Sequence, residues 1–228
     1  MKIAPALIAL MAGACLAAPA FAQSEDGGSV ALGVGAGTLG GGVSAAFAVN
    51  RSLVLRAEGN FLGYDDDFNS SDVHYSGSLK FSTGLATLEY HPAGSGLFVA
   101  AGVLAGNRKA DVTGTPTAGA TQTFTLNGVV YSVAQIAQVN GTVDLGNSAP
   151  FVGVGWDNTF SHAGKWGIRV SAGVAIGDTP KVHLNASGPL AADPIVQTNL
   201  RAEEASLAHD VKDFRNYPVV QISLTHRF

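Results

Sequence analysis

The sequence predicts an all-β protein, a transmembrane antiparallel up-and-down β-barrel of eight strands, with long loops on one rim and a short helix in one of them. Segments of about 10 residues alternate apolar and polar side chains, as the strands of a barrel wall do. Charged residues make up 13% of the chain, below the roughly 25% of soluble domains. After residue 22 no apolar run reaches the roughly 20 residues of a spanning helix. A closed barrel fits all three observations, because every backbone polar group is paired around its ring.

The N-terminus has the layout of a secretory signal peptide. Lys2 precedes an apolar run, and Ala20-Phe21-Ala22 provides the small residues of a cleavage site. The run is too short for a membrane anchor, so we expect residues 1–22 to be removed and residues 23–228 to form one barrel domain. The single cysteine, Cys15, lies in the removed segment, and neither disulfides nor thiol chemistry are expected of the mature chain.

Eight segments carry the alternating pattern. In chain order they are Ser29–Gly37, Gly42–Val49, Leu53–Tyr64, Tyr75–His91, Leu97–Asp111, Thr142–Phe160, Lys165–Leu184 and Pro218–Phe228. The clearest is the seventh, where Trp166, Ile168 and Val170 alternate with glycine, arginine and serine. The fourth loses its alternation near Gly84, and a glycine inside a strand pattern indicates a bulge.

A soluble β-sandwich would also alternate, with its apolar faces packed inward and its polar faces in water. Two features favour the barrel. The less apolar face consists mainly of glycine, serine and alanine, which suits a narrow lumen better than a solvated surface. In addition, Trp156 and Trp166 flank one short turn at the ends of apolar stripes, where an interfacial aromatic belt is expected.

The connections between these segments alternate between short and long. The short ones are Asn50–Ser52, Pro92–Gly96 and Ser161–Gly164, and the long ones are Asp65–His74, Val112–Gly141 and Asn185–Asn216. An outer-membrane barrel has short turns on its periplasmic rim and long loops outside the cell. The first hairpin, which turns near Thr38–Gly41, departs from this layout because its outer turn is tight.

Two of the long loops are expected to contain structure of their own. Asn127-Gly128 lies between β-prone runs within Thr123–Val133, which predicts a hairpin. In Asn199–Phe214 the residues Leu200, Leu207, Val211 and Phe214 recur at helical spacing, which predicts an amphipathic helix. We expect this helix to lie over the barrel mouth or inside it.

The polar face of the strands predicts a charged lumen. The residues expected to point inward are Arg56, Glu58, Asn60, Lys80, Asp157, Arg169, Gln221 and Arg227. Charges of both signs in a narrow interior should pair, because a buried unpaired charge is costly. A network of salt bridges that seals and braces the barrel is the favoured interpretation, since side chains can fill an eight-stranded lumen. The alternative is a gated path for small solutes.

The C-terminal strand links the chain to a known group of proteins. Ile222, Leu224 and Phe228 alternate along a last strand that ends on an aromatic residue. With the signal peptide and the alternating segments, this pattern resembles the small outer-membrane β-barrel proteins of Gram-negative bacteria, of which the OmpA-type and OmpW-type barrels are well-known members. His226 departs from the pattern, because that position is often aromatic in the group.

The resemblance implies a monomeric protein of the bacterial outer membrane, in contact with lipid and lipopolysaccharide. It also implies periplasmic chaperones as partners, and an assembly signal of Ile222, Leu224 and Phe228 that the barrel assembly machinery reads. The role expected from it is structural or in interactions, with a narrow porin-like channel or transporter for small solutes as the alternative. Lipid A modification is a third and weaker hypothesis.

Other motifs do not predict chemistry. Gly35–Gly40 fits a dinucleotide-binding glycine pattern, but alternation follows where a helix is required. His74 and Ser76 resemble the His-x-Ser pair of lipid A deacylases without a matching acidic motif. The acidic run Asp65–Asp72 lacks the spacing of a known Ca²⁺ loop. We therefore expect no enzymatic activity, no cofactor and no metal site, and the excess of 17 acidic over 13 basic residues argues against nucleic acid as a partner.

Overall fold

The computed structural model describes residues 29–70, 73–116, 123–132, 134–161 and 163–228. Its strands are β1 (Ser29–Gly37), β2 (Gly40–Asn50), β3 (Leu53–Ser70), β4 (Val73–Tyr90), β5 (Leu97–Pro116), β6 (Thr123–Leu126), β7 (Val129–Ser132), β8 (Gln138–Asp144), β9 (Ser148–Asp157), β10 (Trp166–Ile176), β11 (Lys181–Ser187) and β12 (Asn216–Arg227). The helices are α2 (Pro194–Asp210) and two 3-10 turns, η2 (Pro92–Gly94) and η3 (Lys212–Arg215). The expected signal peptide, residues 1–22, lies outside the described residues.

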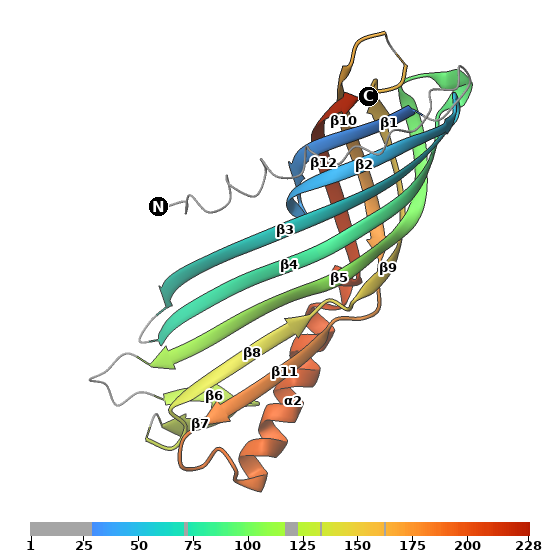
Figure 1. Cartoon of the computed structure of the whole chain (residues 1–228). Coiled ribbons are helices and arrows are strands. Elements are labelled where there is room, and N and C mark those ends of the chain that lie inside the picture. The colour runs from blue at the N-terminus through green and yellow to red at the C-terminus, as the bar shows by residue number, and fades with distance from the viewer. Residues whose placement is uncertain (1–28, 71–72, 117–122, 133, 162) are drawn as a thin grey trace.

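Eight strands close into a ring in the order β1-β2-β3-β4-β5-β9-β10-β12, and all neighbours are antiparallel (Figure 1). The first and last strands pair directly, with Val34 opposite Leu224. On the other side the ring closes where Val99 of β5 faces Val154 of β9. The predicted eight-stranded antiparallel barrel is therefore confirmed. No described helix is long and apolar enough to cross a membrane.

Side chains of the ring alternate between an apolar outer face and a buried inner face. Leu55 and Ile168 are 49% and 47% exposed on the outside, whereas their neighbours Arg56 and Arg169 are buried inside. This alternation is the pattern of a wall between lipid and a packed lumen. It holds around the ring because the side-chain period of a strand is two residues.

The apolar outer face ends at a defined line on β3, β4 and β5. Beyond Phe61, Ser82 and Ala105, the outward positions are mostly charged or polar. They include Asp65, Asp67, Lys80, Lys109 and Asp111. An outer surface that changes from apolar to charged along continuous strands matches the step from hydrocarbon to water. The long strands thus continue past the apolar belt.

Contrary to the expectation from parity, Lys80 lies outside the lumen. It is exposed and shares the outer face of β4 with Leu88 and Tyr90, whereas Phe81 and Leu85 are buried inside. Parity misleads on this strand because its inward side chains include large apolar ones that fill the lumen instead of facing lipid.

The expected bulge at Gly84 is also wrong. The pairing of β4 with β3 and β5 runs past this residue without a shift in register. A register irregularity lies instead in the pairing of β2 with β3, between Ala48 and Asn50 at the end with the short turns. The pattern near Gly84 changes because inward and outward positions are both small or apolar there, not because a residue is inserted.

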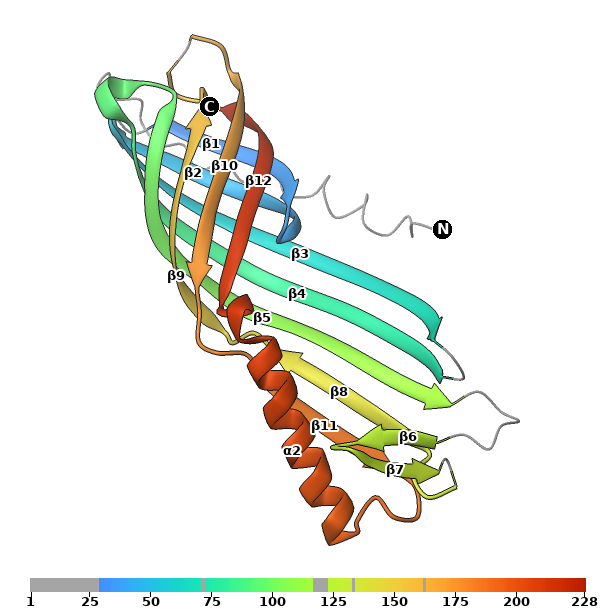
Figure 2. The same cartoon turned by 180° about the vertical axis from the view of Figure 1, so that it is seen from behind.

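β5 is shared between two regions of sheet. Its first half pairs with β9, whereas from Lys109 onward it pairs with β8, which in turn pairs with β11. The far ends of β3, β4 and β5, together with β8 and β11, form what we call the outer sheet, which extends beyond the ring (Figures 1 and 2). The predicted strands Thr142–Phe160 and Lys165–Leu184 are each split in two by this arrangement.

Hydrogen bonds from the backbone and side chain of Arg108 stabilise the fork where β8 and β9 separate. Leu145 N donates to Arg108 O at 3.0 Å. The Arg108 guanidinium donates to the carbonyl oxygens of Leu145 and Gly146 at 3.1 and 3.2 Å. These bonds satisfy polar groups that the departing strand would otherwise leave unpaired.

Parts of the predicted loops Asp65–His74 and Val112–Gly141 are strand instead. β3 continues to Ser70, β4 begins at Val73 and β5 continues to Pro116. Aspartate and serine are typical of loops, but here they lie on paired strands whose outer side faces solvent.

α2 packs on the outer sheet and not over the barrel mouth. Val196 and Leu200 are buried in a cluster with Leu126, Tyr131 and Ile136. Figure 2 shows the helix and the β6–β7 hairpin in front of β8 and β11. The expected position over or inside the lumen is therefore wrong.

The helix begins earlier than the sequence indicated, at Pro194 instead of Asn199. Asp193 caps it, because its side chain accepts a hydrogen bond from Ile195 N at 2.8 Å. A proline at the first position is also favourable, since its fixed φ suits a helix start. The apolar stripe alone did not mark this turn, and Phe214 at the predicted end lies in η3.

The predicted Asn127-Gly128 hairpin is confirmed as β6 and β7. Both residues adopt positive φ, 49° and 76°, as a tight two-residue turn requires. Asn127 N donates to Glu203 Oε2 at 3.1 Å, which ties the hairpin to α2. The neighbouring Glu204 Oε1 accepts from Leu184 N at 2.6 Å, so the helix also covers one N–H of the edge strand β11.

Replacing Glu204 with alanine should loosen α2 from β11. The change removes the acceptor of Leu184 N and costs about 1 kcal/mol of local stability. We expect faster proteolysis within residues 185–215, with an unchanged barrel on a gel. Glu203→Ala, which breaks the contact with Asn127 instead, is the matched comparison. Equal cleavage rates in wild type and E204A would contradict the assigned contact.

Candidate functional site: the filled lumen and its vestibule

Five charged side chains meet inside the ring, and we call them the ion network: Arg56, Glu58, Glu89, Asp157 and Arg169. Arg56 Nε lies 3.0 Å from Glu89 Oε1, and Arg56 Nη2 lies 2.5 Å from Asp157 Oδ2. Arg169 Nη2 lies 2.8 Å from the same Glu89 oxygen, and its Nη1 lies 3.2 Å from Glu58 Oε1. None of these side chains is more than 4% exposed. Glu89 therefore joins two arginines from opposite walls of the barrel.

Polar contacts around the ion network hold its members in place. Asp157 accepts from Thr159 N at 2.7 Å and from the Thr159 hydroxyl, which in turn lies 2.6 Å from Thr225 Oγ1. On the other side Gln221 donates to Asn60 Oδ1 at 3.0 Å. Such support matters because a half-satisfied buried polar group costs more than a fully bonded one.

An apolar cluster fills the lumen from the ion network toward the end with the long loops. It contains Leu39, Leu85, Phe98, Ala100, Leu104, Ala149, Phe151, Ala175 and Val219. The guanidinium of Arg169 lies 5.0 Å from the Phe98 ring centroid, so the two layers touch. We call this set the apolar plug.

The short β1–β2 turn closes the plug from above. Leu39 at its tip is fully buried. Tyr217 OH donates to Thr38 O at 2.7 Å, and Thr38 N donates to Val220 O at 2.9 Å, which holds the turn against β12. The tight turn of the first hairpin, which departs from the predicted pattern of long outer loops, thus has a packing role.

Glycine at the lumen wall makes room for the plug. A Cβ added to Gly173 would lie 2.6 Å from the Phe151 ring and 2.4 Å from Val152 O, closer than side-chain carbons approach. The sequence predicted small residues in a narrow lumen. Here a glycine without a side chain leaves the space that the large Phe151 ring occupies.

Between the wall and the ion network, a void of about 10 Å³ beside Asn60 and Gln221 has room for about one water.

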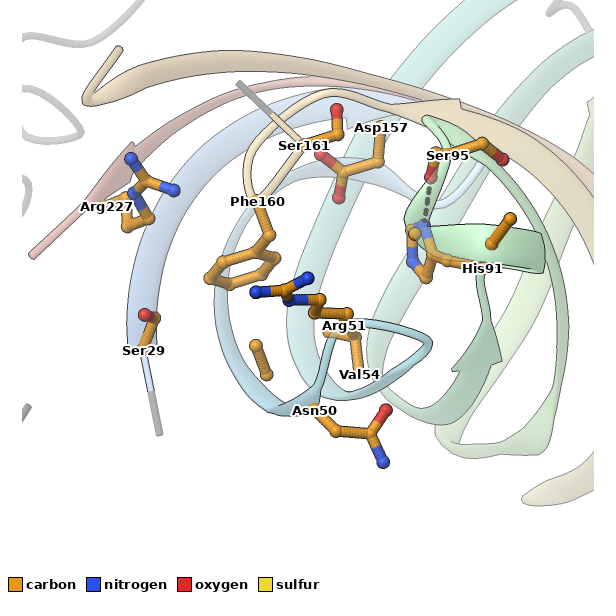
Figure 3. Close-up of a pocket in the computed structure, with 13 residues that line it drawn as sticks. Ser29, Asn50, Arg51, Val54, His91, Ser95, Asp157, Phe160, Ser161 and Arg227 are labelled. Carbon is orange, nitrogen blue, oxygen red and sulfur yellow. Dashed lines mark hydrogen bonds between the residues drawn. The ribbon is translucent and has the colours of Figure 1, made fainter. Parts of the chain in front are cut away.

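A cavity of about 430 Å³ opens at the end of the ring with the short turns, and we call it the vestibule (Figure 3). Its polar and charged lining residues are Ser29, Asn50, Arg51, His91, Ser95, Asp157, Ser161 and Arg227. Asp157 and His91 connect it to the ion network: His91 Nε2 lies 3.7 Å from Glu89 Oε2, and its Nδ1 lies 3.1 Å from Ser95 O. The vestibule is thus the open space beneath the filled lumen.

The structure brings most of the predicted lumen residues together. Arg56, Glu58, Asn60, Asp157, Arg169 and Gln221 are all buried within the ring. Lys80 is outside it, as described above. Arg227 lies at the rim of the vestibule, where it donates to the carbonyl oxygens of Ala163 and Gly164 at 3.4 and 3.3 Å.

Sequence reasoning missed Glu89 and His91. Glu89 is fully buried and contacts both arginines, which makes it the centre of the ion network. Alternation counted back from Tyr90 and Leu88, both exposed on the outer face, would have placed Glu89 inside. This alternation is clear at the end of β4 near the short turn. The inward apolar residues Phe81 and Leu85 on the same strand concealed which face is the inner one.

Aromatic side chains gather where the barrel ends at the short turns. Trp156 and Trp166 are exposed on the outer face. The Trp166 and His226 rings lie 4.7 Å apart edge to face, and His226 lies 4.8 Å from Phe228. Ile222, Leu224 and Phe228 are also exposed outside, and their role as an assembly signal stays a prediction.

In the acidic run Asp65–Asp72, the first three aspartates are spread over two faces of β3, whereas residues 71–72 lie outside the described residues. Asp65 and Asp67 point outward, with Asp66 between them on the other face. Within the part of the chain that the structure describes, no three His, Cys, Asp or Glu side chains are grouped to hold a metal ion.

A closed antiparallel ring of eight strands, apolar outside and filled inside, defines a small transmembrane β-barrel. Among solved structures the chain is similar to CarO2 of Acinetobacter baumannii, with 20% identity and a TM-score of 0.60 over 88% of this chain and 98% of that one. It is also similar to CarO of the same organism, with 21% identity and a TM-score of 0.58 over 91% and 100% of the two chains. This likeness shows a shared fold and confirms the expected resemblance at that level. No family model and no curated protein matches the sequence.

Proposed function

We propose that the protein is an integral barrel of the bacterial outer membrane, with a sealed lumen and a structural or interaction role outside the cell. The observation that carries this proposal is the lumen filled by two successive layers, the ion network and the apolar plug. Buried charges that are paired from several strands brace a wall, whereas a conducting pore needs a continuous wet path.

The outer sheet supports the interaction part of the proposal. It stands beyond the apolar belt and presents charged residues such as Asp65, Lys109 and Asp111 on its outer side. In an outer-membrane barrel the end with long connections faces the surroundings, and the end with short turns faces the periplasm. Lipid and lipopolysaccharide would then contact the apolar belt.

A narrow channel is the second candidate. The vestibule supports it, because an open cavity of about 430 Å³ reaches the ion network from one end. Passage would require both the network and the plug to move. Enzymatic activity, including lipid A modification, has no assigned site and is not proposed.

Conductance in planar lipid bilayers tests the sealed lumen. We expect no steady openings from the wild-type barrel, because both layers block the path. Insertion is checked with a variant that opens space in both layers, Arg56→Ser, Glu89→Ser and Phe151→Ala combined, which should conduct if it folds. Heat-modifiable migration on a gel reports the folding of each protein. Steady openings of the wild type, at a size that tracks these substitutions, would replace the sealed barrel with the channel.

A further inference from the structure

We infer that the vestibule is a binding site for the anionic group, a carboxylate or a phosphate, of a small organic molecule. The inference goes beyond the sealed-barrel role and does not depend on whether the lumen conducts. Three features carry it: the size of the vestibule, an excess of cationic side chains around it, and a floor that separates it from Glu89.

The vestibule has the dimensions of a ligand site. Its volume of about 430 Å³ lies within the roughly 300–1,000 Å³ of pockets that hold small molecules. Separate segments converge on it: the β2–β3 turn, the η2 turn, the connection after β9 and the ends of β1 and β12. Val54 and Phe160 form an apolar part of the wall, and serines from three of the segments add hydroxyl groups.

Two lining arginines lack an acidic partner. Among the residues that the structure describes, no Asp or Glu oxygen lies within 4.0 Å of the Arg51 or Arg227 guanidinium. Among the described residues, the Arg227 guanidinium donates through Nη2 to the backbone carbonyls of Ala163 and Gly164, and other N–H groups of this five-donor side chain make no hydrogen bond there. Figure 3 shows Arg51 extending into the space between Phe160 and His91 in that view.

The acidic lining residue, Asp157, is already neutralised. It lies 2.5 Å from Arg56 Nη2 and accepts two further hydrogen bonds from Thr159. Glu89 does not line the cavity. The buried His91 ring lies between the cavity and Glu89, with its Nδ1 facing Ser95 O and its Nε2 facing Glu89. An anion in the vestibule would therefore meet guanidinium groups at the mouth and an imidazole at the floor, and no carboxylate among the described lining residues is left without a cationic partner.

These groups select an anion with two oxygens and a small apolar part. A guanidinium presents parallel N–H groups that match a carboxylate or a phosphate, and such charge-assisted bonds are about twice as strong as neutral ones. The anionic head would lie at Arg51, with Arg227 at the rim adding positive charge, and a short aliphatic part would lie against Phe160 and Val54 (Figure 3).

Isothermal titration of the folded barrel in uncharged detergent tests the site, with butyrate and propyl phosphate as separate probes. The tighter of the two identifies the head group as carboxylate or phosphate. We expect the double variant Arg51→Gln, Arg227→Gln to bind that probe about tenfold more weakly or worse, a loss of about 1.4 kcal/mol. Arg51→Gln alone should give part of the loss, and it carries the test if the change in β12 impairs folding.

A matched control removes the same charge at the other end of the molecule. Arg201 and Arg215 are exposed on α2 and η3, so the double change to Gln should leave affinity within about twofold of wild type. The inference is overturned if wild type binds neither probe, or if the control pair weakens binding as much as the vestibule pair. A channel result in the conductance experiment would leave this test unaffected.

Discussion

Replacing Arg56 with methionine should lower the free energy of unfolding by about 3–5 kcal/mol. Arg56 lies 3.0 Å from a Glu89 oxygen and 2.5 Å from an Asp157 oxygen. Methionine keeps part of the side-chain volume but leaves both carboxylates buried next to each other with Arg169 as the remaining cation. Urea unfolding in lipid vesicles, followed by the fluorescence of Trp156 and Trp166, measures the change.

A second substitution separates charge pairing from packing. Asp157→Asn added to Arg56→Met removes one of the orphaned charges and keeps an oxygen for Thr159. The double variant should therefore be more stable than the sum of the single losses predicts, with a coupling of about 0.5–3 kcal/mol. Arg201→Met, on the exposed face of α2, should change stability by less than about 0.5 kcal/mol. An unchanged midpoint for Arg56→Met would show that the network does not brace the wall.

The second large effect is expected at Phe151 in the apolar plug. Phe151→Ala should cost about 3–5 kcal/mol, because a buried ring is lost and the rigid wall cannot collapse into the space. The ring lies over Gly153 and Gly173, so no neighbouring side chain is positioned to fill the cavity from that side. The same urea titration measures the loss.

Val152 provides the matched control for Phe151. It is the next residue on β9, but it points outward and is 48% exposed. Val152→Ala should therefore have a much smaller effect than Phe151→Ala. The Phe151→Ala barrel should still show no steady openings in planar bilayers, because the ion network still crosses the lumen. Equal losses at the two positions would mean that the inner face is no better packed than the outer one.

The part of the fold that follows from local alternation could be predicted from the sequence. Wherever one face met lipid and the other a polar lumen, as at Leu55 and Arg56 or Ile168 and Arg169, the two-residue period placed the residues correctly. It failed on β4, where Phe81 and Leu85 are apolar but inward, so Lys80 was misplaced and Glu89 missed. Periodicity reports a difference in polarity between faces and carries no information on which face is the inside.

The outer sheet could not be predicted for a different reason. The change of pairing partner along β5, from β9 to β8, depends on contacts between residues far apart in the chain, such as Lys109 opposite Asp144. Asp65 to Ser70 read as a loop because their composition suits solvent, and composition alone does not distinguish a solvated strand from a turn. The position of α2 on β11 likewise depends on Glu204 and Leu184, a contact without a local signature.

The fork in β5 has a mechanical consequence. β3, β4 and β5 pass from the belt into the outer sheet without a break in pairing, so no hinge separates the membrane anchor from what stands above it. From Lys109 to Pro116 the continuing strand adds about 25 Å along its own axis. The outer sheet is therefore held at a fixed height and orientation relative to the barrel. A surface that it presents to a partner would already be oriented relative to the bilayer.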